Sequence, residues 1–150
     1  MTSSSDHPSD GGAVLNRTLE GGTVRIDTER AELAVSVLAP GLLRLRYGAG
    51  ELGPSIPATA AIDPAFEERP VEMELDEERT GLTLRTPDLH LEIEDDPLSC
   101  RLRDADGRTL TEDRFGLAAP AADAPEEEST QGTLILERRL LPGERLFGLG

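Results

Sequence analysis

The sequence predicts an all-β fold, an antiparallel β-sandwich, and three observations support this prediction. Short stretches in which apolar and polar residues alternate recur from Val24 onward, and this period of two is typical of half-buried strands. Gly, Pro or Asp bounds each stretch, as expected for turns. Helical periodicity is hard to find. About seven to nine strands at spacings of about 8 to 12 residues then favour two sheets packed face to face.

The first predicted hairpin occupies residues 31–47. Its two strands are joined by a turn at Ala39-Pro40-Gly41, where Pro and Gly favour chain reversal. The alternation predicts that the first strand points Leu33, Val35 and Val37 toward the core. The second strand is predicted to point Leu43, Leu45 and Tyr47 toward the core, and Arg44 and Arg46 away from it.

The rest of the chain alternates between predicted strands and loops. Residues 1–13 are almost devoid of apolar side chains and predict a disordered tail, which leaves 14–150 as one sandwich domain. A proline-rich stretch, 48–70, and an Ala, Pro and Glu-rich stretch, 118–130, predict loops. The remaining predicted strands are residues 71–75, 82–85, 89–94, 98–103, 108–110 and 133–140.

Asp104-Ala105-Asp106-Gly107 predicts a tight turn between two strands, because Asp and Gly tolerate the backbone angles of hairpin turns. Strand 98–103 before it places Leu98, Cys100 and Leu102 on the core face. The turn faintly resembles a calcium loop. Such a loop ends in a bidentate glutamate, however, and the corresponding residue here is Phe115, so the turn interpretation is preferred.

Charge and composition exclude several classes of function. The chain has 30 acidic and 15 basic residues, a formal net charge of −15. Nucleic acids and anionic membranes are bound through Lys and Arg, so we expect neither as a partner. No apolar run is long enough to span a membrane, the N-terminus lacks a secretory pattern, and the single cysteine cannot form an internal disulfide. We therefore expect a cytoplasmic location.

All 15 basic residues are arginine. Two explanations of this acidic, lysine-free composition stay open. One is adaptation to high salt, which screens the self-repulsion of the acidic groups. The other is compositional drift in a GC-rich genome without salt adaptation.

The sequence offers no catalytic constellation. A nucleophile needs a base, and the only histidines are His7, in the predicted tail, and His90, which alternates with Leu89 and Leu91 and so points away from the predicted core. One cysteine and two distant histidines give no zinc-ligand spacing. We therefore expect no metal and no other cofactor.

Two glycan-directed hypotheses also find little support in the residues. Glycoside hydrolysis needs two carboxyl groups about 5 to 10 Å apart across a sugar. The chain has carboxylate clusters at Asp95-Asp96, Glu67-Glu68 and residues 126–128. We interpret these clusters as surface charge, because no apolar pocket or aromatic platform accompanies them. A free-standing lectin uses aromatic faces, and this chain has only Tyr47, Phe66, Phe115 and Phe147.

Residues 143–150, GERLFGLG, resemble the G-E-R-F-Y-G-L-G-E type motif that closes the N-terminal β-sandwich of glycoside hydrolase family 31. Residues 35–47, VSVLAPGLLRLRY, resemble an early hairpin of that domain, and residues 95–113, DDPLSCRLRDADGRTLTED, resemble a later one. The three stretches occur in the family's order, and the resemblance covers residues 24–150. Leu146 is a departure, since an aromatic residue is common there.

The resemblance implies a galactose-mutarotase-like supersandwich and, for the parent protein, a retaining α-glycosidase such as an α-glucosidase or α-xylosidase. In that family a (β/α)₈ barrel with both catalytic aspartates follows the motif. Because the sequence stops at Gly150, we expect the barrel to be absent and the domain itself to be non-catalytic. The expected partners are that barrel and, through it, an α-glycoside.

The same resemblance suggests Phe147, Gly148 and Gly150 as substrate-binding residues at the active-site rim, because loops near this motif help to shape the rim in relatives. Plain packing at the domain junction is the alternative role for these residues. For the whole chain, two further hypotheses stay open. One is an autonomous carbohydrate-binding module, and the other is an interaction sandwich without a ligand.

Overall fold

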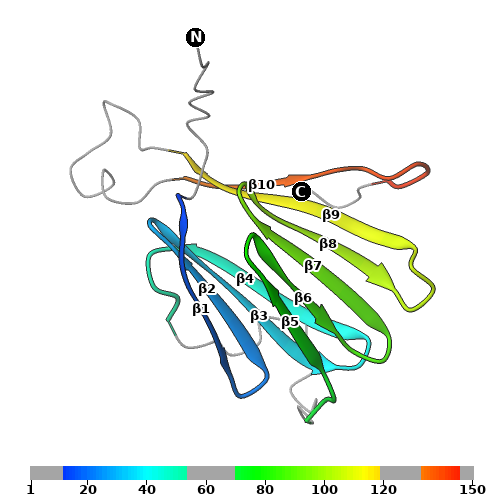
Figure 1. Cartoon of the computed structure of the whole chain (residues 1–150). Coiled ribbons are helices and arrows are strands. Elements are labelled where there is room, and N and C mark those ends of the chain that lie inside the picture. The colour runs from blue at the N-terminus through cyan, green and yellow to red at the C-terminus, as the bar shows by residue number, and fades with distance from the viewer. Residues whose placement is uncertain (1–11, 54–69, 119–132, 146–150) are drawn as a thin grey trace.

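A computed structural model describes residues 12–53, 70–118 and 133–145, and these residues form ten strands (Figure 1). The first four strands make one antiparallel sheet, with strands β1 (Val14–Glu20), β2 (Thr23–Thr28), β3 (Ala31–Ala39) and β4 (Leu42–Ala49). The other six make a second antiparallel sheet, with strands β5 (Glu74–Glu78), β6 (Gly81–Arg85), β7 (Leu89–Asp95), β8 (Leu98–Asp104), β9 (Thr109–Ala118) and β10 (Thr133–Arg138).

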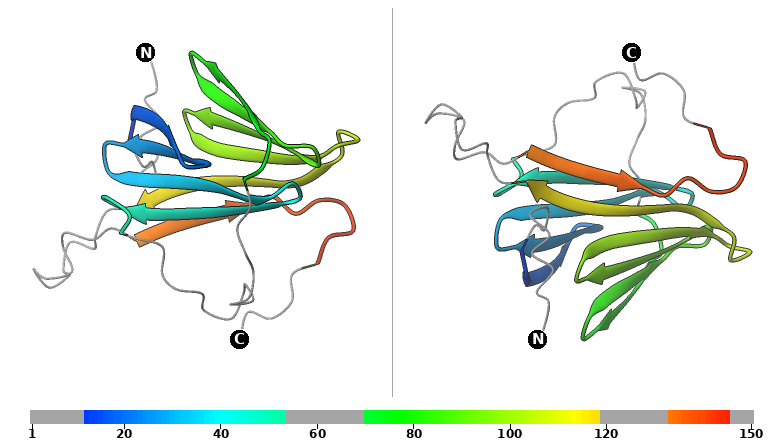
Figure 2. Two further views of the ribbon diagram at one scale, coloured as in Figure 1. Left: turned by 90° about the horizontal axis from the view of Figure 1, so that it is seen from below. Right: turned by 90° about the horizontal axis from the view of Figure 1, so that it is seen from above.

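Both sheets are simple meanders in which each strand pairs with its neighbours in sequence. They lie face to face (Figure 2), which confirms the predicted β-sandwich. The described residues contain no helix that is long and apolar enough to cross a membrane.

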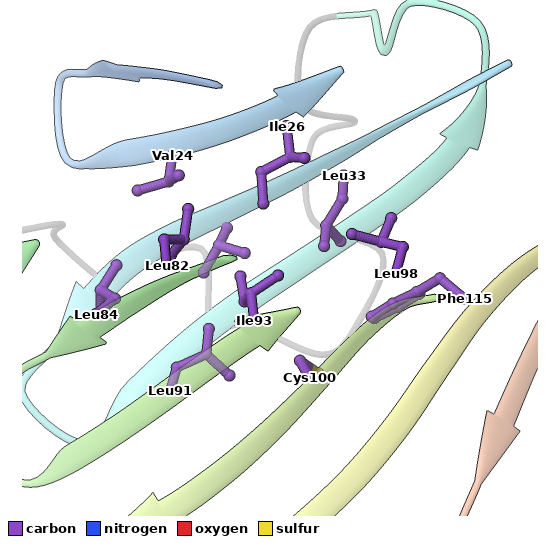
Figure 3. Close-up of a cluster of buried hydrophobic side chains, with 11 residues drawn as sticks. Val24, Ile26, Leu33, Leu82, Leu84, Leu91, Ile93, Leu98, Cys100 and Phe115 are labelled. Carbon is purple, nitrogen blue, oxygen red and sulfur yellow. The ribbon is translucent and has the colours of Figure 1, made fainter. Parts of the chain in front are cut away.

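The core lies between the two sheets and consists mainly of aliphatic side chains (Figure 3). Successive side chains of a strand point to opposite faces of the sheet, so every second residue points inward. The inward apolar side chains of neighbouring strands together form one continuous layer. The four-stranded sheet contributes Val24, Ile26, Leu33 and Val35, and the six-stranded sheet contributes Leu82, Leu84, Leu91, Ile93, Leu98, Cys100 and Phe115.

The register of β3 and β4 confirms the first predicted hairpin. Ala39 pairs with Leu42, so Pro40 and Gly41 form the two-residue turn. The inward residues face one another across the strands as predicted, in the pairs Leu33 with Tyr47, Val35 with Leu45 and Val37 with Leu43. Arg44 and Arg46 therefore lie on the outer face.

The turn at residues 104–107 is also confirmed. The Gly107 amide donates to the Asp104 carbonyl at 3.0 Å, and Gly107 has a φ of +82°, which glycine adopts without steric cost. The Asp104 carboxylate accepts hydrogen bonds from the amides of Asp106 and Arg108. Phe115, which stands where a calcium loop would need a glutamate, is a buried core residue, so the calcium interpretation has no structural basis.

The largest differences from the predicted strand boundaries are at three strands, and the strand predicted at 133–140 ends at Arg138. The predicted alternation begins at Val24, whereas β1 pairs with β2 from Val14. The strand predicted at 71–75 is displaced toward the C-terminus, since β5 occupies residues 74–78. The acidic residues at the end of β5 also pair with β6, and β5 is the solvent-facing edge strand of its sheet. The strand predicted at 108–110 extends to Ala118, since Phe115 and Leu117 continue the core face of β9.

Other parts of the prediction lie wholly or mostly outside the described residues. They are the tail, of which only residues 12 and 13 are described, the loop at 48–70, of which 54–69 fall outside, and the loop at 118–130.

Polar contacts connect the two sheets at their margins. Arg17 of β1 forms an ion pair with Asp95 at the end of β7, and its Nη1 donates to the Glu78 carbonyl at 3.0 Å. Arg30, in the turn after β2, donates from Nη2 to the Leu117 carbonyl at 3.1 Å. These contacts fix the position of one sheet on the other.

The outer face of the six-stranded sheet carries a cross-strand charge ladder centred on Arg101. This arginine donates from Nε to Glu112 at 2.9 Å and lies 3.6 Å from Glu92, which also pairs with Arg103. The hydrogen bond from Arg101 is the main reason why the pKa of Glu112 is lower than usual, and Arg139 adds to the effect.

Candidate functional site

The residues predicted for an active-site rim, Phe147, Gly148 and Gly150, lie outside the described residues, so their role stays a prediction. The chain that leads to them is described as far as residue 145. After β10 it forms a turn in which the Glu144 amide donates to the Leu141 carbonyl at 2.9 Å and the Glu144 carboxylate accepts from the Leu141 amide at 2.9 Å.

An apolar surface feature of the described residues lies at the margin where β4 and β10 approach each other (Figure 2). On β10, Leu136 is paired with Phe115 and Leu134 with Leu117. Directly paired residues share a face, so both leucines lie on the inner, core-facing side of the sheet. They are nevertheless 57% and 46% exposed, because the four-stranded sheet ends at β4 and does not cover them.

A groove of about 470 Å³ follows from this arrangement, and its lining is mainly apolar. Leu45 and Tyr47 of β4 form one wall, and Leu134 and Leu136 of β10 form the other. The rings of Tyr47 and Phe115 contact each other at a centroid distance of 5.2 Å and an interplanar angle of 48°. These aromatic rings therefore pack on each other within the sandwich.

A buried ion pair adds polar character to this groove. Asp113 is only 7% exposed, and Arg138 on the adjacent strand donates to its two oxygens at 2.7 and 2.8 Å. The hydrogen bond to Asp113 raises the pKa of Arg138 above its usual value. Because each partner satisfies the other, the pair fixes β10 against β9 and leaves no uncompensated charge on the carboxylate.

Cys100, which also lines the groove, is not a reactive nucleophile. Burial raises its pKa to about 12, and the negative charge of Asp113 contributes to the shift. The thiolate is the reactive form of cysteine, and a thiol with this pKa stays protonated at neutral pH.

The remaining candidates that the structure describes do not assemble into a site. His90 lies on the face opposite Leu91, with its Nε2 4.0 Å from Glu92, in the charge ladder. Asp95 pairs with Arg17 at the sheet margin. Glu67-Glu68 and residues 126–128 lie outside the described residues. Within the described ranges, no group of three or more His, Cys, Asp or Glu side chains could hold a metal ion.

Sequence reasoning identified the strand that carries Leu134 and Leu136 but not the groove. The pattern TLILER is apolar at three consecutive residues, so the sequence does not show which face of this strand packs against the other sheet. The pairing of Asp113 with Arg138 depends on the register of β9 and β10, which sit on either side of a long connection. A signal was nonetheless present, because opposite charges at matching positions of two adjacent strands favour a cross-strand pair.

The fold and this margin define a class of protein, an antiparallel β-sandwich domain with an apolar groove at a sheet margin. Residues 32–150 match the family model of the glycosyl hydrolase 31 N-terminal galactose mutarotase-like domain. The chain therefore belongs to this family, as its motifs predicted, and it represents a non-catalytic domain of a glycosidase. No curated protein matches the chain.

Proposed function

We propose that this domain packs against the catalytic (β/α)₈ barrel of a retaining α-glycosidase, of the α-glucosidase or α-xylosidase type, and helps to frame its active site. The observation that carries the proposal is the family match over residues 32–150. The open apolar margin supports it as well, because a domain that functions inside a larger enzyme exposes apolar surface where its neighbour packs. The proposed location of the enzyme is the cytoplasm.

The domain supplies binding surface and support in this proposal, and the barrel supplies the two carboxyl groups that glycoside hydrolysis requires. Phe147, Gly148 and Gly150 are proposed to contribute to the rim of the substrate pocket. An aromatic ring at such a rim would pack on the apolar face of a sugar.

The test is to express the polypeptide encoded by the complete reading frame and to assay it with 4-nitrophenyl α-D-glucoside and α-D-xyloside. The proposal expects hydrolysis of at least one substrate, with the α-anomer as the first product by NMR. It also expects Phe147→Ala to raise KM several-fold with a smaller change in kcat. Absence of α-glycosidase activity, or release of the β-anomer, would contradict the proposal.

The isolated domain is expected to have no measurable affinity for maltose, isomaltose or xylosyl sugars in calorimetric titration. Tyr47 and Phe115 support this expectation, because their rings pack on each other. Clear binding by residues 1–150 alone would instead favour an autonomous carbohydrate-binding module.

A further inference from the structure

The segment that follows β10, residues 139–144, is held at both of its ends (Figure 1). At its start, the Arg139 amide donates to the Glu112 carbonyl at 2.9 Å, and the Arg139 side chain donates from Nη1 to the Glu112 carboxylate at 3.1 Å. The preceding residue, Arg138, is fixed by its two hydrogen bonds to the buried carboxylate of Asp113. The start of the segment is therefore attached to β9.

Leu141 and Glu144 are the first and last residues of a turn that closes the other end of the segment. Pro142 and Gly143 occupy its two central positions, with a φ of +83° at Gly143, and this arrangement favours a type II turn. The Glu144 amide donates to the Leu141 carbonyl at 2.9 Å, as expected for such a turn. The Glu144 carboxylate in addition accepts from the Leu141 amide at 2.9 Å. One glutamate therefore satisfies both backbone groups of Leu141.

The charge of Glu144 also connects this turn to the buried ion pair. The hydrogen bond and the charge of Asp113 have larger effects on the pKa of Arg138, and the negative charge of Glu144 raises this pKa further. Glu144 itself is half-buried. Its carboxylate is thus coupled to Arg138 and, through Arg138, to Asp113 of β9.

The turn matters for function because Phe147, a residue of the proposed substrate rim, follows Glu144 by only three residues. Three residues span at most about 10 Å, so the direction in which the chain leaves the turn restricts where the ring can lie. We infer that Glu144 is a positioning residue, which holds this turn so that Phe147 is presented to the substrate pocket of the glycosidase. The inference rests on the proposed function and adds to it a residue that acts through the rim.

Two variants of Glu144 test the inference in the complete glycosidase, with the 4-nitrophenyl glycoside that it hydrolyses. Glu144→Ala removes the acceptor of the Leu141 amide and is expected to raise KM about threefold or more, with kcat changed by less than about twofold. Glu144→Gln keeps an acceptor oxygen at the same reach and is expected to restore most of this loss. Glu137→Ala is the matched control, because the Glu137 side chain is 61% exposed and lies 4.0 Å from Arg114. The control is expected to leave both constants unchanged.

A double-mutant cycle with Phe147→Ala separates positioning of the rim from a general loss of structure. If Glu144 acts through Phe147, then Glu144→Ala raises the KM of the Phe147→Ala enzyme by less than about twofold. A turn that only stabilised the domain would give the product of the two single effects. That product, an unchanged KM of Phe147→Ala, or a KM of Glu144→Ala equal to that of the control would overturn the inference.

Hydrogen exchange of the same proteins tests the turn without depending on activity. The peptide that contains Leu141 is expected to exchange at least about fivefold faster in Glu144→Ala than in the unsubstituted protein, and Glu144→Gln is expected to keep most of the protection. Equal exchange in all three proteins would overturn the inference and leave the proposed function intact. An absence of α-glycosidase activity would instead overturn the proposed function, and the inference with it.

Discussion

Gly81, the first residue of β6, lies where two strands approach closely. A Cβ atom at this position would lie 2.2 Å from the Ile93 carbonyl oxygen and 3.3 Å from the Glu94 Cα. Both are backbone atoms, so the conflict cannot be relieved by rotating a side chain. We expect Gly81→Ala to lower the free energy of unfolding by about 1 to 3 kcal/mol.

Urea unfolding followed by circular dichroism measures this loss. Gly53→Ala is the matched control, because no atom of the described residues lies within 4 Å of a Cβ added at Gly53. This control is expected to change stability by less than about 0.5 kcal/mol. Equal stability of the two variants would show that β6 and β7 separate easily at Gly81.

The buried thiol of Cys100 predicts a specific pH dependence. Its pKa is about 12 in the folded protein and near the ordinary 9.0 when the chain unfolds. Above pH 9 the unfolded state loses this proton first, so the stability that the thiol contributes is present below pH 9 and is lost as the pH rises toward 12. Cys100→Ala removes this contribution, and its stability should fall less steeply between pH 8.5 and 11 than that of the unsubstituted protein.

Denaturant unfolding at several pH values gives this comparison, since all other titrating groups are common to both proteins. Thiol modification provides an independent measurement. Ellman's reagent is expected to react with Cys100 slowly in the native protein and rapidly in urea. Parallel pH profiles of the two proteins would contradict the prediction.

At the scale of strands, Arg17 has more effect than its position on an edge strand suggests. Its side chain and that of Asp95 are only 15% and 16% exposed, and the pair connects β1 to the end of β7. Arg17→Met removes the charge and keeps much of the side-chain volume, which leaves the Asp95 carboxylate partly buried without its ion pair. We expect a loss of about 1 to 3 kcal/mol in the free energy of unfolding.

Arg85→Met is the control, because the pair of Arg85 with Asp76 is longer, at 3.6 Å, and its side chains are 42% and 72% exposed. Exposed pairs contribute about 0 to 1 kcal/mol. Thermal and urea unfolding of both variants make the comparison. If Arg17→Met cost no more than the control, β1 would be held by its pairing with β2 alone.

The strands also show how far the sequence predicts this fold. Alternation correctly assigned the inward residues of β3, β4 and β8, because apolar and polar residues alternate along a half-buried strand. This pattern is weak in edge strands, such as β5, which ends in exposed acidic residues. Contacts between distant strands produce no pattern in the sequence of either strand. The ion pair of Arg17 with Asp95 and the groove beside Leu134 depend on how two sheets are placed, which no single segment encodes.

At the scale of the whole molecule, the net charge of −15 makes stability depend on salt in two opposing ways. Salt screens the repulsion among acidic groups, which stabilises the folded state. It also weakens exposed ion pairs such as those of Arg101 with Glu92 and Glu112. Because exposed pairs contribute about 0 to 1 kcal/mol each, we expect the relief of repulsion to be larger.

The melting temperature is therefore expected to rise by about 5 °C or more when KCl increases from 0.05 to 1 M at pH 7, as the Debye length falls from roughly 14 to 3 Å. The control is the same series near pH 4.4, the isoelectric point of the sequence, where net charge and self-repulsion are small. The rise should largely disappear there. An equal rise at both pH values would indicate a general effect of the salt on apolar burial, and a flat or falling curve at pH 7 would argue against salt adaptation.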